Sequence, residues 1–343
     1  MTRSPSSRAL SKTREWRNTD LATFRNQIVP ENQPAVLRGL VKNWPSVQAG
    51  LKSPRALCDY VEKFDGGRPV ETLFGEPAIR GRFFYSDDLT SVNFERRPET
   101  VSSSLERLLT HMSDENPPAI FIQSASVADC LPNFSAENAI DLAGRSAIPR
   151  IWIGNSITVT THYDLSDNIA CVVGGRRRFT FFPPEQIRNL YVGPIHFTLA
   201  GQPVSMVSLD EPDLVRYPRF EQALAAAQTA DLEPGDAVYI PYFWWHHVES
   251  LASFNVLVNY WWDDAAAKFG SPYDCLLHGF LTLRQLPPNQ RAAWRAVFDH
   301  YVFQTDADPV AHLPPHRRGA LGEMTPELAA HIKSALLKRL TRP

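Results

Sequence analysis

The chain has 343 residues and a formal net charge of −2 at pH 7, because 35 Lys and Arg nearly balance 37 Asp and Glu. This balance argues against nucleic acid or an anionic membrane as the main partner. Hydrophobic residues make up 43% of the chain and aromatic residues 11%. Such a composition is globular and excludes disorder over most of the length.

Four cysteines at positions 58, 130, 171 and 275 contain no C-x-x-C pair. Their scatter argues against a disulfide framework and against a structural zinc site. The first residues are polar and lack the apolar stretch of a secretory signal, and no later run approaches the length of a membrane span. We therefore expect a cytoplasmic protein.

The N-terminal half mixes short helices with short strands. Residues 1–14 are expected to form a flexible arm, with Trp16 as the first anchored side chain. Residues 15–149 are expected to form an α/β segment packed on the core. Within it, apolar periodicity predicts strands over 34–40 and 119–123 and helices over 53–64 and 99–112.

Between residues 150 and 264 the pattern changes to short apolar or alternating runs separated by Gly, Pro and Asp. Such a series predicts a mainly β core of the sandwich or barrel type. An insertion over about 184–232 interrupts the series, and residues 221–230 in it are expected to be helical. The predicted strands lie in IWIGNSITVTTHYD, NIACVV, RFTFF, DAVYIP and FNVLVNYWW.

Residues 265–343 return to helical periodicity. Trp294, Val297, Phe298 and Tyr301 fall on one stripe of a predicted helix, and Thr325 followed by Pro has the pattern of a helix N-terminus. This region is expected to be a homodimer contact or a covering layer, and the pattern does not choose between them. His312 and His316 are separated by two prolines, so they are expected to lie in a structural loop.

The strongest chemical signal is the pair His162 and Asp164 in TVTTHYD. Strand residues two apart project from the same face, so both ligating groups point the same way. Continued alternation would add Ser166 and Asn168 to this polar stripe. An isolated H-x-D pair binds no metal in most chains, so a third ligand is needed.

His246, which follows two tryptophans, is the candidate third ligand. Two His and one Asp form the facial triad of non-haem Fe(II) oxygenases, which leaves coordination positions open on one side. Joining residues 82 positions apart requires distant strands to adjoin, as they do in a jelly roll. His247 should point away from His246 and is assigned a supporting role.

Two further polar residues are predicted on apolar strand faces. Arg177 alternates with Phe179 and Phe181, so its guanidinium needs an anion. A dicarboxylic cosubstrate would supply one. Asn259 lies on an apolar strand, where its amide either orients a bound carboxylate or is satisfied within the core.

Beyond these residues, the chain resembles a known family. The segments THYDLSDNIACVVGGRRRFTFFPPEQIRNLYVGP, EPGDAVYIPYFWWHHVES and NVLVNYWW occur in order and at similar spacing in the cupin-like JmjC-domain Fe(II)/2-oxoglutarate dioxygenases. The resemblance is to the asparaginyl hydroxylases of hypoxia-inducible factor and to a bacterial cupin-like branch. It implies a double-stranded β-helix (jelly roll) core with an N-terminal α/β segment and a C-terminal helical region, often used for dimerisation.

The resemblance also implies roles for individual residues. Fe(II) would be held by His162, Asp164 and His246. The cosubstrate would contact Arg177, Asn168, Asn259, Thr160 and Trp261, and the substrate would contact Gln123 and Trp244. The family's usual lysine and tyrosine for 2-oxoglutarate are replaced by Arg177 and Phe121. Val159 stands where a hydroxyl is expected, unless Thr158 or Thr160 provides it through a different strand register.

The implied reaction uses Fe(II), 2-oxoglutarate and O2 to hydroxylate a C–H bond. The leading hypothesis is hydroxylation of a protein side chain. A second is hydroxylation of a small molecule or free amino acid, and a third is a metal-binding cupin without enzymatic activity. Arginine can bind a carboxylate in bidentate fashion, so the replacement at Arg177 preserves the charge of the anchor while changing its shape.

Overall fold

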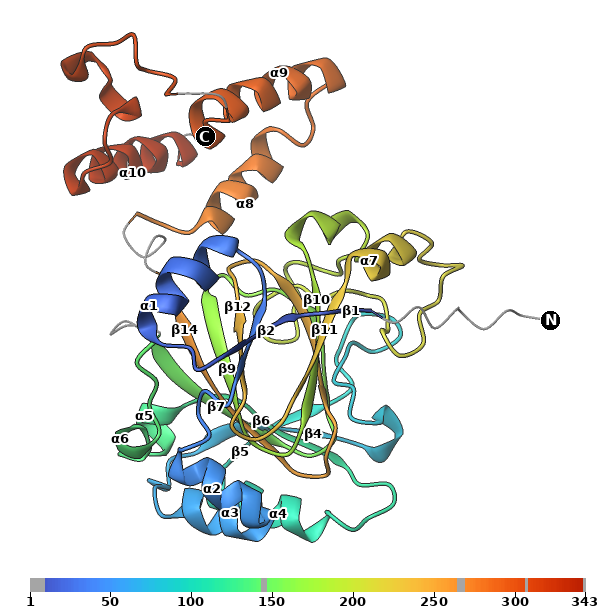
Figure 1. The fold of residues 1–343 in the computed structure, drawn as a ribbon. Helices are drawn as coiled ribbons and strands as arrows, with labels where there is room; N and C mark the ends of the chain where they lie inside the picture. Colours follow the sequence, from blue (N-terminus) through green and yellow to red (C-terminus); the bar gives the residue numbers. More distant parts are fainter. Residues whose placement is uncertain (1–9, 143–146, 264–268, 306–307, 342–343) are drawn as a thin grey trace. The chain divides into compact units, whose positions relative to one another are not determined.

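The computed structural model describes residues 10–142, 147–263, 269–305 and 308–341. The chain divides into two compact units, Met1–Asp263 and Asp264–Pro343. The first unit contains all of the strands in the described residues, arranged as two sheets that face one another (Figure 1).

The smaller sheet has five strands, and most of them come from the predicted β core. Strands β10, β13 and β8 are antiparallel neighbours, so they bring residues from 158 to 250 side by side. In pairing order, the sheet consists of β1 (Ser11–Lys12), β11 (Gln228–Leu232), β10 (Arg177–Phe182), β13 (Trp245–Ser250) and β8 (Thr158–His162).

The larger sheet has nine strands and joins the N-terminal segment to the β core without a break. Its central strands β9 and β14 are antiparallel over seven aligned pairs. In pairing order, the sheet consists of β2 (Arg14–Arg17), β3 (Ala35–Arg38), β12 (Ala237–Ile240), β9 (Asp167–Gly174), β14 (Asn255–Trp262), β7 (Ile148–Gly154), β6 (Ala119–Ser126), β4 (Val70–Gly75) and β5 (Glu95–Glu99).

The space between the two sheets is filled by apolar side chains from alternate positions of facing strands. Val172, Val238 and Leu257 come from the larger sheet, and Phe179 and Val248 from the smaller. All five are buried. This two-sheet β core is the cupin-type jelly roll that the sequence predicted.

Helices α1 to α6 of the first unit cover the outer face of the larger sheet, whereas α7 packs on the smaller sheet (Figure 1). Leu57 and Val61 of α3 and Leu105 of α4 pack with Cys171 and Val256 of that sheet. Ser53 and Thr100 cap these two helices, as their side chains accept hydrogen bonds from Ala56 and Ser103 N–H. The helices are α1 (Leu21–Thr23), α2 (Pro45–Lys52), α3 (Pro54–Glu62), α4 (Val101–Thr110), α5 (Val127–Cys130), α6 (Phe134–Glu137) and α7 (Phe220–Ala226).

The insertion covers the outer face of the smaller sheet and is shorter than predicted. The helix expected over 221–230 ends at Ala226, and residues 228–232 form strand β11 beside β10. The Gln-Thr-Ala sequence that follows is compatible with a helix or a strand, and it forms a strand because it pairs with β10. The inserted segment is therefore residues 184–227, and its Leu190 and Phe220 pack on Phe182 and Trp245.

The predicted flexible arm is wrong in part. Ser11–Lys12 pairs in parallel with β11, and Arg14–Arg17 pairs in parallel with β3. Short runs of charged residues carry no strand signal, so edge pairing with existing sheets determines these two strands. Residues 1–9 of the arm lie outside the described residues, while Trp16 packs against the core as expected.

The second unit is helical, as predicted from its periodicity. Thr325 caps the last helix by accepting from Leu328 N–H, and Pro occupies its first position. His312 and His316 lie in turns, outside the three helices. The homodimer expected through this unit stays a prediction. The helices are α8 (Pro272–Thr282), α9 (Pro288–Phe298) and α10 (Pro326–Leu340).

Short 3-10 and π-helical turns complete the described structure. The 3-10 turns are Val29–Glu31, Pro77–Ile79, Pro184–Arg188, Pro315–Arg317 and Gly319–Leu321, and the π-helical turns are Phe24–Ile28 and Asp299–Phe303.

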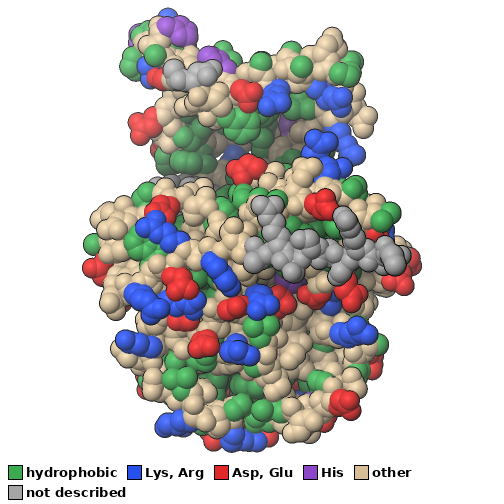
Figure 2. All heavy atoms as spheres, turned by 45° about the vertical axis from the view of Figure 1, so that its right-hand side comes forward, with side chains coloured by type: hydrophobic (Ala, Val, Ile, Leu, Met, Phe, Trp, Pro, Cys, Tyr) green, Lys and Arg blue, Asp and Glu red, His purple; other side chains and the backbone are tan. Residues whose placement is uncertain are grey.

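The outer surface agrees with the near balance of charges. On the face of the first unit in Figure 2, basic and acidic side chains are intermingled. Within the described ranges, no helix has both the length and the apolar character required to cross a bilayer.

Candidate metal centre and its two cavities

Two cavities open side by side near one end of strand β8. The larger has a volume of about 680 Å³ and the smaller about 50 Å³. Both are lined by His162, Asp164, Trp152, Val159 and Trp261. A group bound at His162 and Asp164 is therefore accessible from both cavities.

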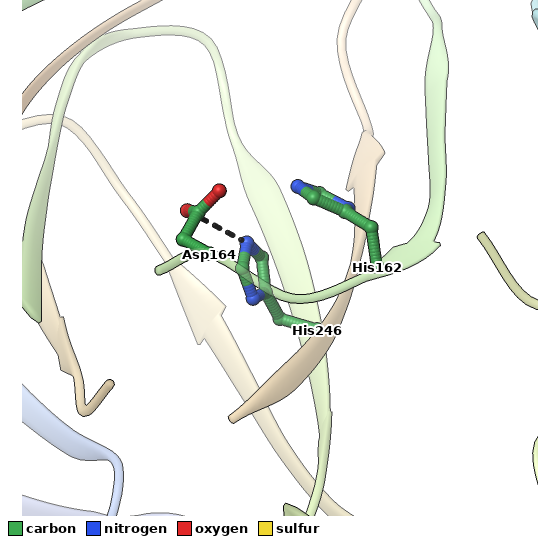
Figure 3. A group of neighbouring side chains, drawn as sticks. All are labelled: His162, Asp164 and His246. Carbon is green, nitrogen blue, oxygen red and sulfur yellow. Dashed lines mark ion pairs between the residues drawn. The ribbon is translucent and has the colours of Figure 1, made fainter. Parts of the chain in front are cut away.

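The structure brings the three predicted ligands together. His162 is the last residue of β8, and Asp164 follows it in the turn toward β9 (Figure 3). His246 lies opposite His162 on the paired strand β13. Their imidazole centroids are 4.2 Å apart, and His246 Nε2 is 3.6 Å from Asp164 Oδ2. One ligand atom from each of the three lies within 4.8 Å of the other two.

Backbone carbonyls fix the orientation of both imidazoles. His162 Nδ1 lies 2.9 Å from Thr160 O, and His246 Nδ1 lies 3.0 Å from Trp244 O. A proton on each Nδ1 leaves the lone pair of Nε2 free, and a metal ion binds a histidine through such a lone pair. Asp164 Oδ2 is buried and has no hydrogen-bond partner among the described residues. These donors fit a divalent metal ion.

Burial also favours the neutral imidazole at His246. Desolvation, with His162 nearby, lowers the pKa of His246 to about 4. The side chain is therefore neutral at physiological pH. A neutral imidazole can ligate a metal without first losing a proton.

A bulge in β8 determines which residues face the cavities. His246 pairs with His162, but Val248 pairs with Val159, so β8 has one extra residue in this interval. As a result, Val159, Thr160 and His162 all line the larger cavity. Thr160 Oγ1 is buried and has no partner among the described residues. Thr160 can therefore supply the hydroxyl that Val159 lacks.

Arg177 lies in the smaller cavity together with the three candidate ligands. It is 2% exposed, and its Nε and Nη2 are buried without hydrogen-bond partners in the described structure. Desolvation lowers the pKa of Arg177 to about 10, so the guanidinium is still charged at neutral pH. A buried, unpaired cation beside a cavity marks the binding position of an anion.

Asn168 and Asn259 also line the smaller cavity, on the side formed by β9 and β14. Asn259 Oδ1 accepts a hydrogen bond of 2.7 Å from Trp152 Nε1, and its Nδ2 lies 3.2 Å from Asn168 Oδ1. The sequence left open whether Asn259 is satisfied internally or faces a ligand. The structure shows the amide hydrogen-bonded internally at the edge of the smaller cavity, and its contact with a bound carboxylate stays a prediction.

The larger cavity contains Gln123, Trp261 and Phe121 of the predicted residues. The ring of Phe121 stacks on Phe83 and Trp152 at 6.0 and 5.8 Å between centroids. At this position the wall is apolar, whereas Thr160 and Gln123 make other parts of it polar. The cavity thus offers both aromatic surface and hydrogen-bonding groups.

Trp244 is not placed as expected. Its indole is 2% exposed, packs in the core between the sheets and donates from Nε1 to Asn32 O at 3.1 Å. Trp245 lies on the opposite face of β13, against Tyr163. Neither tryptophan lines either of these two cavities, so Trp244 belongs to the core and is not placed to contact a substrate in them. Two adjacent tryptophans beside a candidate ligand do not by themselves indicate whether either of them lines a cavity.

Several cavity residues were missed in the sequence. Trp152 and Arg150 alternate on β7 toward the larger cavity, and that alternation could have revealed them. Glu71 and Arg96 come from the N-terminal strands, and Leu199 from the inserted segment. These last three have no local pattern, because only the tertiary fold brings them to the cavity.

Comparison with known proteins identifies the family. A model of the family described as "Cupin-like domain" matches residues 21–268, which include every strand of both sheets except β1 and β2. The chain belongs to this cupin-like family. The family assignment agrees with the jelly-roll core described above.

Relatives of this cupin-like chain have varied names. It is 27% identical over 267 residues to lysine-specific demethylase JMJ31 of Arabidopsis thaliana, covering 70% of this chain and 48% of that protein. It is 26% identical over 262 residues to mouse (Mus musculus) tRNA wybutosine-synthesizing protein 5, covering 70% and 74%. It is 27% identical over 276 residues to the human (Homo sapiens) bifunctional peptidase and (3S)-lysyl hydroxylase JMJD7, covering 71% and 81%. The chain spans about half the length of the first of these.

Proposed function

We propose that this chain is an Fe(II)- and 2-oxoglutarate-dependent oxygenase that hydroxylates a side chain of a protein. The observation that supports the proposal is that an acidic and a basic side chain, each with unsatisfied polar atoms, line the same small cavity. Within the described residues, neither Asp164 Oδ2 nor the Nε and Nη2 of Arg177 has a hydrogen-bond partner, and both side chains line the smaller cavity. A divalent cation and a dicarboxylate would satisfy both.

The chain's own residues would divide the work between binding and positioning. His162, Asp164 and His246 would hold Fe(II), which when bound supplies the redox chemistry that dioxygen activation requires. Arg177 would bind the distal carboxylate of 2-oxoglutarate, and Thr160 would donate a hydrogen bond from its hydroxyl. Asn259, held by Trp152, would keep Asn168 at the side of the same cavity.

The larger cavity is where the substrate would lie. Its volume of about 680 Å³ exceeds that of the smaller cavity by more than tenfold, and Gln123 and Trp261 line it beside the metal ligands. The resemblance to asparaginyl hydroxylases and the name of the human lysyl hydroxylase both favour a protein side chain. A cavity of this size is also sufficient to admit a side chain together with its backbone.

The test measures succinate formed from 2-oxoglutarate with Fe(II) and ascorbate present. Asp164→Ala and His162→Ala should abolish it, since each removes a metal ligand. The matched control is Asp231→Ala, which removes a carboxylate from β11 of the same sheet, outside both cavities. The substrate class is then determined by mass spectrometry of a peptide mixture, in which a hydroxylated peptide gains one oxygen atom from labelled dioxygen.

Three results would overturn the proposal. Equal loss of succinate in Asp231→Ala and Asp164→Ala would show that the triad is not the metal site. No succinate from the unmodified chain, together with tight metal binding, would instead favour a non-enzymatic metal-binding cupin. Labelled oxygen in a free amino acid but in no peptide would favour a small-molecule hydroxylase.

A further inference from the structure

Strand β13 has a second group of ionisable side chains on the face turned away from the triad. Side chains alternate along a strand, so His247 and Glu249 share the outer face while His246 and Val248 face inward. Asp210 reaches the same place from the inserted segment (residues 184–227). One ligand atom from each of Asp210, His247 and Glu249 lies within 4.8 Å of the other two.

His247 is the member of this group that points to a ligand. Its side chain is 4% exposed, and Nδ1 is 3.2 Å from Thr161 Oγ1 on the neighbouring strand. Nε2 is also buried, and within the described part of the chain it has no hydrogen-bond partner. A native core leaves few such nitrogens unsatisfied, and this one belongs to a group with two carboxylates.

The neighbouring cations do not neutralise the two carboxylates by direct pairing. Arg178, opposite Glu249, forms its ion pair with Asp231 at 2.7 Å. Arg82 lies near enough to interact with Asp210 electrostatically, but its guanidinium stacks on Phe84 at 4.0 Å. Among the described residues, no ion pair within 4.0 Å involves Asp210 or Glu249.

We propose a second site for a divalent transition-metal ion, formed by Asp210, His247 and Glu249. Zinc is the ion used to test it. One imidazole nitrogen and two carboxylate oxygens are ligands of this class, whereas calcium and magnesium prefer oxygen alone. Ligand atoms about 2 Å from a zinc ion lie within about 4 Å of one another, so small side-chain movements close the site. Asp210 is exposed, so water can complete the coordination.

The second ion would fasten the inserted segment to the smaller sheet. Asp210 belongs to that segment, and the two other ligands belong to β13. The same segment contributes Leu199 and Val204 to the wall of the larger cavity. Binding on the outer face would therefore stabilise one wall of the cavity without contacting the triad.

The experiment counts zinc ions on the full chain after chelator treatment and equilibration with Zn²⁺. We expect two ions per chain in the unmodified protein, one in Glu249→Gln and one in Asp164→Asn. The double variant should bind none. Glu185→Gln, an acidic residue of the inserted segment outside the group, is the matched control and should retain two.

A second measurement tests whether the second ion holds the inserted segment against the smaller sheet. Zinc should slow proteolysis within residues 198–216 several-fold in the unmodified chain and in Glu185→Gln, but not in Glu249→Gln. If Glu249→Gln fails to fold by circular dichroism, Asp210→Asn replaces it, because that carboxylate is exposed and lies in the inserted segment.

The outcomes separate this inference from the proposed function. Two ions retained in both Glu249→Gln and Asp210→Asn would overturn the second site, as would a single ion that Asp164→Asn abolishes. A single ion that survives Asp164→Asn and is lost in Glu249→Gln would support the second site and contradict the triad.

Discussion

Arg177 gives the sharpest test of the cosubstrate cavity, because its charge is buried and its Nε and Nη2 have no hydrogen-bond partner among the residues that the structure describes. Burial lowers its pKa well below the ordinary value of an arginine, to about 10. One pKa unit corresponds to about 1.36 kcal/mol, so a decrease of about 2.5 units means that burying the charged side chain costs about 3 kcal/mol. Because the folded pKa is the lower one, this cost is fully present below pH 10 and is relieved as the pH rises toward 12.5.

Arg177→Met should therefore stabilise the ligand-free chain at pH 7. Methionine retains a long apolar stem but no charge, so the free energy of unfolding should rise by up to about 3 kcal/mol. 2-Oxoglutarate with Zn²⁺ at 100 times its Kd should stabilise the unmodified chain by about 2.7 kcal/mol and the variant by much less. Urea unfolding of both chains, with and without the two ligands, measures all four values.

Arg178→Met is the matched control, because Arg178 is the next residue but is exposed and paired with Asp231. Its effect should stay within about 1 kcal/mol, and 2-oxoglutarate should still stabilise it. The reasoning would be refuted if Arg177→Met lowered the stability of the ligand-free chain, or if 2-oxoglutarate stabilised both variants equally.

Three further predictions concern two residues that line the cavities and one glycine in the turn between β9 and β10. Thr160→Val should raise the KM for 2-oxoglutarate several-fold with a smaller change in kcat, because it removes a hydroxyl that has no partner in the described part of the chain and lies near the candidate ligands. Steady-state succinate assays measure both, and an unchanged KM would remove Thr160 from the site. Asn259→Leu should lower the free energy of unfolding by about 1–3 kcal/mol, since Trp152 Nε1 loses its acceptor; urea unfolding tests this, and no change would show that water replaces the amide. Gly175→Ala should lower the melting temperature by several degrees, as Gly175 has φ +74° and an added Cβ would lie 2.2 Å from Asn255 Oδ1; calorimetry measures this, and an unchanged Tm would contradict the tight turn.

Of the candidate metal ligands, His162 and Asp164 were predictable from short-range geometry, whereas His246 joins them only through the pairing of β13 with β8. His162 and Asp164 are two apart at the end of a strand, and alternation places them on one face. Arg177 was predictable for the same reason, as it shares its face with Phe179 and Phe181. In these cases the periodicity of one strand is sufficient, and the rest of the fold only brings the strands together.

Features that depend on contacts between distant segments were not predictable. The pairing of Ser11–Lys12 with β11 adds an edge strand whose residues have no strand propensity. The bulge that brings Val159 and Thr160 to the cavity follows from the match between β8 and β13, not from either strand alone. Trp244 packs between the sheets on the same side as Val248, but it lies in the core beside the cavities and does not line either of them.

Strand β13 presents His246 to one side of the smaller sheet and His247 to the other. Deleting or inserting one amino acid before this pair would exchange the two histidines between faces, and every following side chain would change sides with them. The hydroxyl of Thr161 and the carboxylate of Asp164 would then meet the wrong imidazoles. Length variation during evolution should consequently be confined to the connecting loops, and homologous chains should differ in β13 by substitution alone.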